Sequence, residues 1–305
     1  MKRIIITILI SIFIITGAVA SKNLYSCRIP IKNRGISDAI ASGDLDLLFI
    51  GSSTFRSNVD MHLLDDAYEG RVYDISYGGN QCVATSIQYD EIKARSDHDY
   101  GLMVFEMGPL MITEDVKLSD SRVIWDLSLK GKLDLYNEMR KAGNTDASVA
   151  YEYFITSGMD DLITYPVTER IYATRYYKGS KTDATQSPGA EVLDSEEFDI
   201  SDAMPNEAQE RAVRDIIEKC KRDGQAFVFL ESPVYYRLGE DPVYKTYEER
   251  FIRLLEEEDA PYILASEADF DDHLAEYFED MNHMSDAGRK AYTRELIRIL
   301  KDRQN

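Results

Sequence analysis

The chain has 305 residues, of which 55 are acidic and 35 basic, so its formal net charge is −20. An acidic excess of this size argues against nucleic acid as a partner, because that binding depends on basic surface. It also disfavours tight binding of an anionic phosphate polymer, and is typical of a soluble exported protein.

The first element of the chain is a long apolar run behind a short basic start. Ile4–Ala20 contains seventeen residues without a charge, a length at the lower limit for spanning a bilayer. Its end, Ala18-Val19-Ala20, has the small-x-small form of a cleavage site. We therefore expect residues 1–20 to be a signal peptide or a membrane anchor, and residues 21–44 to be a linker. Both alternatives place the globular part outside the cytoplasm, either membrane-anchored or secreted.

Beyond residue 44, apolar strand-like runs alternate with amphipathic helical stretches, a pattern typical of a parallel sheet with helices on both faces. The expected strands are Leu45–Gly51, Arg71–Ser76, Gly101–Met107, Ala226–Glu231 and Pro261–Ser266. The clearest helices are expected from Pro205 to Gly224, over Thr246–Glu258 and from Ser285 to about Arg303. Because ligands bind at the carboxyl ends of parallel strands, we expect the chemistry at that edge.

The stretch from about residue 112 to 204 differs in kind. It is rich in tyrosine and acid, as in Tyr151-Glu152-Tyr153-Phe154, and is then polar through Lys178–Asp202. We expect a helical insertion plus an exposed loop on the side of the active site. The sequence leaves two roles open for its tyrosines: they could stack on sugar rings, or they could pack the insertion onto its host domain.

Two short segments carry candidate catalytic groups. The first expected strand runs directly into Ser52 and Ser53, and Asp280 lies three residues before His283 on the loop that precedes the last helix. Serine, histidine and aspartate are the parts of a nucleophile, a general base and an orienting carboxylate. Taken alone, each segment has a structural alternative: a serine that caps a helix, and a histidine satisfied within a surface loop.

The order of these segments resembles a known family. Gly51-Ser52-Ser53, followed by Asp280-x-x-His283-x-x-x-x-Gly288, is similar to the first and last sequence blocks of the SGNH (GDSL-type) hydrolases, although many members have aspartate in place of Ser52. Val72–Gly79 resembles the strand and turn whose glycine helps to form the family's oxyanion hole. The resemblance covers about residues 45–110 and 222–300. It is greatest to the exported branch that modifies cell-surface polymers, which includes the lipoteichoic acid D-alanyl transfer protein and the alginate O-acetylation proteins.

The resemblance implies both a fold and a set of roles. Residues 45–305 would form a three-layer, flavodoxin-like α/β domain that carries the mid-chain insertion. Ser53 would be the nucleophile, His283 the general base and Asp280 the orienting carboxylate. The N–H groups of Ser53 and Gly79 would stabilise the oxyanion.

The third sequence block departs from the family pattern. The family usually places an asparagine two residues after the glycine that follows the third strand; here Gly108 is followed at that distance by Leu110. One expected oxyanion donor is therefore missing, and such a loss costs roughly 100- to 1000-fold in rate. Asn80, next to Gly79, is the candidate substitute.

Two charged residues are candidates for binding substrate. Arg56, expected on the first turn of the helix after Ser53, could hold a carbonyl, carboxylate or phosphate, or be an ordinary solvated arginine. Glu231 ends an apolar strand at the chemical edge and could line the pocket or mark a strand exit. We expect no metal or other cofactor, because the histidines do not stand at metal-ligand spacing. With three cysteines and no CxxC, we also expect no disulfide framework.

These observations support three hypotheses. The first is an exported serine-dependent acyl esterase or O-acyltransferase that acts on cell-surface or extracellular carbohydrate polymers. The second is a non-catalytic SGNH-fold module that holds a carbohydrate polymer or acylated glycan for a membrane acyltransferase, which Leu110 and the anchor-like leader suit. The third is an esterase of lipids or short-chain esters. An enzyme would lose activity when Ser53 is replaced, whereas a binding module would be indifferent.

Overall fold

The central feature of the molecule is a parallel sheet. A computed structural model describes residues 2–118, 120–157, 167, 170 and 173–304. In it, five parallel strands are arranged in the order β2-β1-β3-β6-β7. They are β1 Leu45–Ile50, β2 Val72–Asp74, β3 Tyr100–Glu106, β6 Phe227–Leu230 and β7 Tyr262–Ile263. This is the flavodoxin-like order, in which the strand order reverses between β1 and β3. The expected fold class is confirmed.

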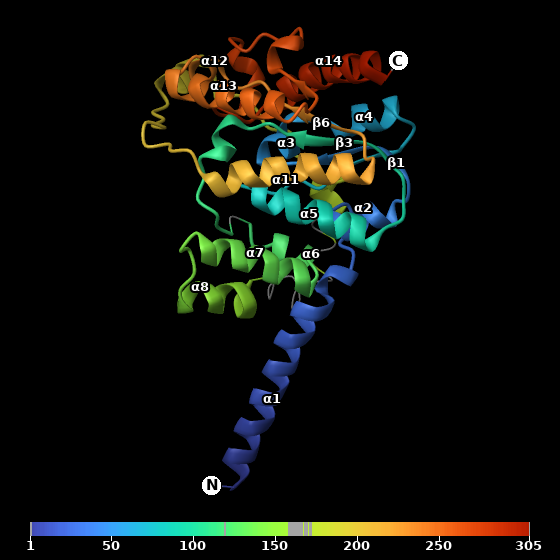
Figure 1. The fold of residues 1–305 in the computed structure, drawn as a ribbon, viewed down its shortest axis with the longest axis vertical. Helices are drawn as coiled ribbons and strands as arrows, with labels where there is room; N and C mark the ends of the chain where they lie inside the picture. Colours follow the sequence, from blue (N-terminus) through green and yellow to red (C-terminus); the bar gives the residue numbers. More distant parts are fainter. Residues whose placement is uncertain (1, 119, 158–166, 168–169, 171–172, 305) are drawn as a thin grey trace.

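Helices cover both faces of this sheet (Figure 1). They are α1 Lys2–Tyr25, α2 Gly35–Ala41, α3 Ser53–Asn58, α4 Met61–Ala67, α5 Cys82–Arg95, α6 Val123–Asp126, α7 Leu129–Lys141, α8 Ala147–Tyr151, α10 Ala190–Ser195, α11 Glu207–Asp223, α12 Tyr236–Gly239, α13 Pro242–Glu257 and α14 Asp286–Gln304. Successive strand side chains point to opposite faces, so Leu48 and Ile50 join the core beneath α5, α11 and α13. Leu47 and Phe49 join the core beneath α3, α4 and α14. Burial on both faces explains why these strands are continuously apolar.

The expected strands are all present, although most are shorter than the apolar runs. The largest difference is in the last strand, where β7 ends at Ile263 instead of continuing to Ser266. The N–H of Leu264 donates to the Glu267 carboxylate at 3.0 Å, and a 3₁₀ turn begins at Ala265. The local side-chain hydrogen bond therefore stops the ladder before the apolar run ends.

The helix ends follow from their capping residues. α11 starts after Asn206, whose side chain accepts the Ala208 N–H at 3.0 Å, and it ends at Gly224 in the left-handed conformation with φ 65°. At the start of α14, Ser285 Oγ accepts the Gly288 N–H at 3.2 Å, as expected for an N-cap. α13 starts four residues earlier than expected, because Asp241 caps it.

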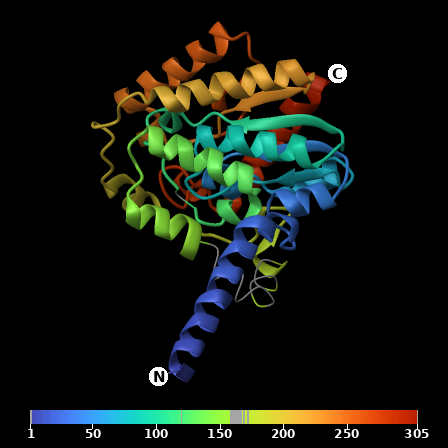
Figure 2. The same cartoon turned by 60° about the horizontal axis from the view of Figure 1, so that its bottom comes forward.

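The apolar helix α1 projects away from the α/β body (Figures 1 and 2). Among the described residues it is the one helix long and apolar enough to cross a membrane. Its last turn does not project: Lys22 Nζ donates to Ser157 O, and Asn23 Nδ2 donates to Phe154 O at 2.8 Å. Both side chains are buried. The end of α1 is thus held by the domain.

The segment 21–44 is therefore not the free linker that we expected from its sequence. Besides the packed end of α1, it contains α2, whose Ile36 is fully buried in the core. The Ile36 N–H donates to Asp126 at 3.0 Å, which ties α2 to the start of the insertion. The segment's polar side chains Lys22 and Asn23, which are typical of a linker in sequence, are buried and donate hydrogen bonds to backbone oxygens.

The insertion has two parts with different contacts. Its helical part, α6 to α8, packs on α5 and on the end of α1, with Lys132 Nζ donating to Asn23 O and Ser26 Oγ. The fully buried Tyr153 donates to Lys132 O within the insertion, and it belongs to the same apolar core cluster as residues of α5 and the sheet. Tyr151 is exposed, and Tyr172 lies outside the described residues.

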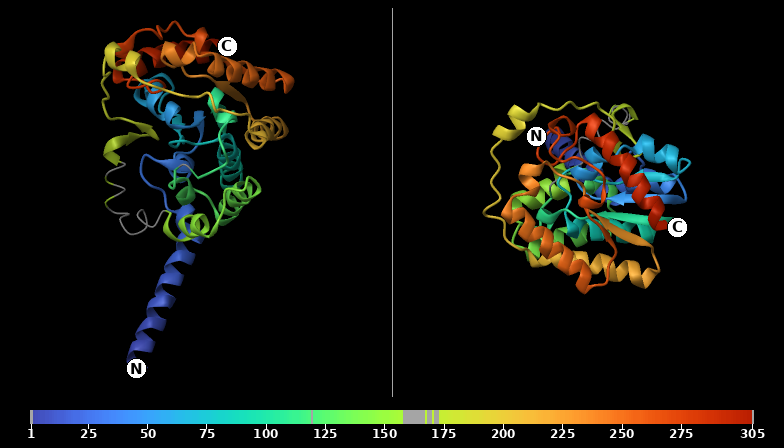
Figure 3. Two further views of the ribbon diagram at one scale, coloured as in Figure 1. Left: turned by 90° about the vertical axis from the view of Figure 1, so that its left-hand side faces the viewer. Right: turned by 90° about the horizontal axis from the view of Figure 1, so that it is seen from above.

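The later part of the insertion lies beside α3. It contains the hairpin of β4 Tyr176–Tyr177 and β5 Ser180–Lys181, and Ser180 Oγ donates to Val59 O at 2.7 Å. Beyond the hairpin, the chain crosses to α10 along the outside of the body (Figure 3). This part therefore contacts α3, the helix that begins at Ser53.

Candidate active site

The turn that carries Ser53, the candidate nucleophile, joins β1 to α3. Ser52 is the N-cap of α3, and its Oγ accepts the Thr54 N–H at 3.2 Å. Ser53 is the first residue of the helix, so its own N–H lies outside the helical hydrogen-bond ladder. The alternative role of a helix-capping serine thus applies to Ser52, while the Ser53 hydroxyl is available for another partner.

That partner is His283, 230 residues further along the chain. Ser53 Oγ lies 2.9 Å from His283 Nε2, and His283 Nδ1 lies 2.8 Å from Asp280 Oδ2. The other carboxylate oxygen of Asp280 accepts the N–H groups of Asn282 and His283 at 2.9 and 2.8 Å. Burial favours a higher pKa for Asp280, but the hydrogen bond and charge of His283, with these N–H groups, hold its pKa below the usual range. The Asp280 carboxylate is therefore ionised and can orient the imidazole.

The loop of His283 is fastened to α3 by Asn58, which the sequence analysis did not identify. The fully buried Asn58 side chain donates to Asn282 O at 3.1 Å and accepts the Met284 N–H at 2.8 Å. These two bonds hold the backbone on both sides of His283. Asn58 ends α3, one turn beyond Ser53, and an asparagine at a helix end gives no sequence signal of such a long-range contact.

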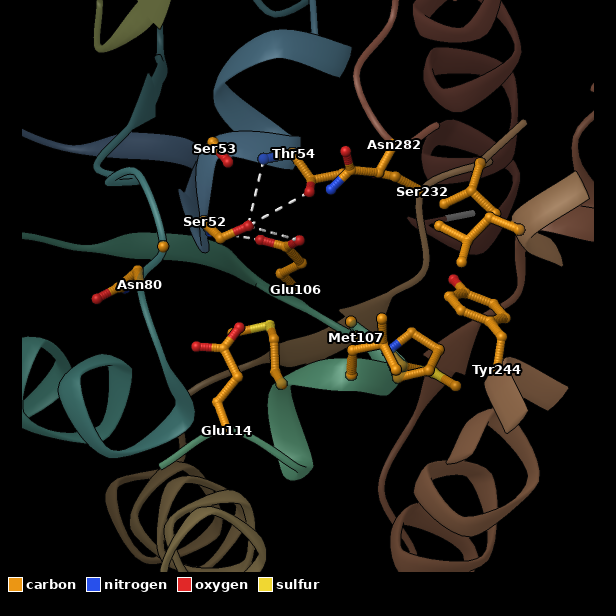
Figure 4. A pocket seen from close by; sticks show the side chains of 17 residues that line it. Ser52, Ser53, Thr54, Asn80, Glu106, Met107, Glu114, Ser232, Tyr244 and Asn282 are labelled. Atoms are coloured by element: carbon orange, nitrogen blue, oxygen red, sulfur yellow. Dashed lines mark hydrogen bonds between the residues drawn. The ribbon is translucent and has the colours of Figure 1, made fainter. Parts of the chain in front are cut away.

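A cavity of about 280 Å³ opens beside the serine pair (Figure 4). Ser53, Gly79 and Asn282 line it together with two glutamates, Glu106 and Glu114. Its apolar lining comes from Met107, Pro109, Leu110, Met111, Val234, Leu238 and Tyr244. Leu110 therefore lies at the site, where the family usually has an asparagine, and contributes apolar surface instead of a donor.

Gly79 adopts the left-handed conformation, with φ 62°, in the turn after β2. It lines the same cavity as Ser53, and its role as the second backbone donor of an oxyanion hole stays a prediction.

The structure contradicts the expectation that Asn80 replaces the missing donor. Asn80 Nδ2 donates to Thr85 Oγ1 at 3.2 Å and to Gln88 Oε1 at 2.8 Å, which uses both of its hydrogens. Its backbone N–H donates to Tyr77 O. Figure 4 shows the side chain pointing away from Ser52 and Ser53. Asn80 stabilises the turn against α5 and has no donor left for a ligand.

Glu106 is a second residue that sequence reasoning missed. It ends β3, is 6% exposed, and accepts hydrogen bonds from both the N–H and the Oγ of Ser52. Burial raises its pKa, against the opposing effect of these bonds, a Thr54 hydrogen bond and the charge of His283. The available signal was a carboxylate at the end of an otherwise apolar strand.

Arg56 lies next to the glycine turn, although it does not line the cavity. Its Nη2 would be 3.4 Å from a β-carbon placed on Gly78, and its guanidinium carbon is 6.0 Å from the ring centre of Tyr176. Among the described residues, its buried Nε and Nη1 have no hydrogen-bond partner. Arg56 is therefore not the ordinary solvated arginine of the alternative interpretation.

The structure also contradicts the expectation that Glu231 lines the pocket. Its buried carboxylate accepts the Ala265 N–H at 3.0 Å and faces Glu248. Burial and the neighbouring Glu248 raise the pKa of Glu231 to about 8, against the Ala265 hydrogen bond. Glu231 is not among the residues that line the cavity.

The arrangement of Ser53, His283 and Asp280 is that of a Ser-His-Asp hydrolase. The imidazole can take the serine proton while the carboxylate fixes its tautomer and stabilises the imidazolium. Within the described part of the chain, no group of three or more His, Cys, Asp or Glu side chains is placed to hold a metal ion.

Comparisons with known proteins give limited information. No protein-family model and no curated protein matches the chain. Similar solved structures include Axe2, an acetylxylan esterase from Geobacillus stearothermophilus, at 15% identity and a TM-score of 0.37, covering 85% of this chain and 95% of that one. A tryptophan-to-isoleucine variant of Axe2 has 15% identity and a TM-score of 0.36, covering 87% of this chain and 95% of that one. These similarities are too weak to carry an argument about function.

Replacement of Asn58 by alanine is expected to slow the reaction of Ser53 with a serine-directed phosphonate by at least about tenfold, because the loop of His283 loses two buried hydrogen bonds. The rate is measured by intact-protein mass spectrometry. Asn144→Ala, which removes a hydrogen bond to Val116 O outside the cavity lining, is the control. Equal rates for wild type and Asn58→Ala would contradict the role of Asn58.

Replacement of Glu231 by glutamine is expected to flatten the pH dependence of stability. Between the ordinary carboxyl pKa of 4.5 and about 8, the folded protein retains a proton that the unfolded chain releases, so stability falls as pH rises through this range. Glutamine needs no proton and can still accept the Ala265 N–H. Thermal unfolding across this range should show a smaller decline for Glu231→Gln than for wild type. Parallel declines would show that Glu231 does not titrate in this way.

Proposed function

We propose that this chain is an SGNH-type serine-dependent acyl esterase or O-acyltransferase that acts on acylated carbohydrate polymers outside the cytoplasm. The observation that carries the proposal is the hydrogen-bonded line from Ser53 through His283 to Asp280, next to a cavity at the carboxyl edge of the sheet. The resemblance of the sequence blocks to exported polymer-modifying proteins supports the class of substrate.

The chemistry would proceed through an acyl-enzyme. Ser53 Oγ attacks the ester carbonyl while His283 Nε2 takes its proton, giving a tetrahedral oxyanion. Collapse breaks the ester bond, and His283 returns the proton to the departing alcohol. Water, or a sugar hydroxyl in a transferase, then gives its proton to His283 and attacks the acyl-serine, which releases the acid or the new ester and regenerates Ser53.

The oxyanion would be stabilised by the N–H groups of Ser53 and Gly79. Leu110 and the engaged Asn80 supply no third donor. We therefore expect slower turnover than in a family member that has the asparagine, by roughly 100- to 1000-fold.

The size of the cavity supports a small acyl group. At about 280 Å³ it is at the lower end of the range for ligand pockets, and its lining is largely apolar near Leu110 and Tyr244. An acetyl group fits such a space. This favours an O-acyl glycan over a lipid ester as substrate.

We also propose that α1 remains attached as a membrane anchor. The helix is exposed along its apolar length, whereas Lys22, Asn23 and Cys27, just beyond the cleavage-like motif, are buried in the domain. An anchored enzyme would work at the membrane surface, beside any membrane acyltransferase that supplies the acyl group.

Arg56 is proposed to bind an anionic group of the glycan, such as a uronate carboxylate. The charges of Arg34, Arg122 and Asp120 all act on Arg56. The two arginines approach this one aspartate, at 3.8 and 2.5 Å, so the surroundings of Arg56 hold more positive than negative charge. The buried Asp74 offsets this only in part, because burial raises its pKa to about 7 against the opposing charge of Arg56. The surroundings of Arg56 are thus locally cationic in a chain with a net charge of −20, whereas the cavity beside Ser53 is lined by Glu106 and Glu114.

A serine-directed phosphonate is expected to label the full-length wild type in detergent, and neither Ser53→Ala nor His283→Ala should be labelled at a comparable rate. The mass shift of the intact protein measures labelling, and circular dichroism checks that each variant is folded. Release of acetate from acetylated xylan then tests the substrate class. A folded wild type that is not labelled would reject the enzyme and favour the alternative, a non-catalytic glycan-binding partner of a membrane acyltransferase, which Leu110 also suits.

Arg56→Gln is expected to raise KM for an acetylated polyuronate by about 10- to 100-fold, because a hydrogen bond to a charged group is lost. Acetylated xylan, a neutral glycan, serves as the matched control and should show little change. Steady-state acetate release measures both. An equal change for the two glycans would contradict an anionic group as the ligand of Arg56.

A further inference from the structure

The turn that carries Ser53 rests on a carboxylate from the neighbouring strand. Glu106, the last residue of β3, lies beneath the end of β1, and its two oxygens accept the N–H and the Oγ–H of Ser52 (Figure 4). The Oγ to Oε1 distance is 3.0 Å. Both donors of Ser52 are thus directed to one buried side chain.

Ser52 passes this restraint on to the helix of the nucleophile. Its Oγ, fixed by Glu106, accepts the Thr54 N–H at 3.2 Å. Ser53 lies between these two restrained residues, and its hydroxyl must point at His283 Nε2, 2.9 Å away. The Ser53 hydroxyl is thus presented to His283 from a turn whose flanking residues are both hydrogen-bonded.

The backbone is shaped to admit the carboxylate. A β-carbon on Gly51 would lie 2.5 Å from Glu106 Oε2 and 2.8 Å from Glu106 Cβ, closer than atoms can approach. Glycine before the serine pair therefore allows Glu106 to reach the Ser52 N–H.

We propose that Glu106 is a positioning residue for the Ser53 nucleophile, which it orders by accepting hydrogen bonds from the N–H and the hydroxyl of Ser52. The inference rests on the proposed function. It explains why serine can stand at position 52: an aspartate there would face the Glu106 carboxylate within hydrogen-bond distance, and two buried like charges repel.

The test exchanges the carboxylate between the two positions in the full-length protein. Glu106→Gln is expected to reduce the rate of phosphonate labelling by about 10- to 100-fold, because one of the two oxygens that accept hydrogen bonds from Ser52 becomes an amide NH2, which cannot accept. Ser52→Asp alone should be at least as slow, because two carboxylates meet. In the Glu106→Gln background, however, Ser52→Asp should raise the rate, since the carboxylate introduced on the turn can accept from both the Thr54 N–H and the amide introduced on β3. The effect of the same substitution thus changes sign with the residue at position 106.

A matched control is present elsewhere in the chain. Glu91 accepts hydrogen bonds from the N–H and Oγ of Ser128, which in turn caps α7 by accepting the Gly131 N–H. Glu91→Gln therefore removes the same kind of restraint away from the site, and should lower thermal stability without changing the labelling rate of the folded protein.

The outcomes separate the two proposals. A wild type that is not labelled overturns the proposed function, and this inference with it. A labelled wild type whose Glu106→Gln variant reacts at the same rate, or a double variant no faster than Glu106→Gln, overturns the role of Glu106 alone. Recovery in the double variant is the expected result.

Discussion

The site depends on the hydrogen bond between Ser53 and His283, which joins two residues 230 positions apart. Neither local segment can form it alone, because Ser53 belongs to the first strand-to-helix turn and His283 to the loop before the last helix. The bond exists because α14 packs against α3 and α4 over a shared apolar core. The Asn58 side chain then fixes the position of the loop by hydrogen-bonding to the backbone on both sides of His283. Apolar packing brings α3 and α14 together, and the buried Asn58 amide fixes the His283 loop relative to α3.

The sheet order supplies the second half of the site. Because β1 and β3 are neighbours on either side of the reversal, the turn after β1 lies directly above Glu106 at the end of β3. A buried carboxylate is costly unless its oxygens accept hydrogen bonds, and here Ser52 provides them. The cost of burying Glu106 is thus offset by the two hydrogen bonds that it accepts from Ser52.

The sequence was sufficient to predict those features that repeat or follow local rules. Apolar runs predicted the strands, capping residues such as Ser285 predicted helix ends, and the order of the serine and histidine segments pointed to side chains that the structure brings together. It could not show the direction of side chains at strand ends. Glu231 and Glu106 both end apolar strands, yet one faces Glu248 and the other faces the nucleophile turn.

Long-range partners account for the other differences. Asn80 was a plausible donor by position, but Thr85 and Gln88 on the next helix use its amide hydrogens. The segment 21–44 appeared to be a linker because it is polar in sequence. Its polar residues have partners in the distant insertion, as Asn23 does with Phe154 O. Such contacts join residues that no local pattern connects.

The most direct measurement of the central claim is to map the acyl-enzyme. Full-length protein would be mixed with an activated acetyl ester, whose good leaving group makes deacylation rate-limiting, quenched in acid, digested and analysed by mass spectrometry. The account predicts one acetyl group on the peptide that contains Ser53, and its loss as the ester is exhausted. Ester hydrolysis with no acetyl on Ser53, or with acetyl on another residue, would contradict it.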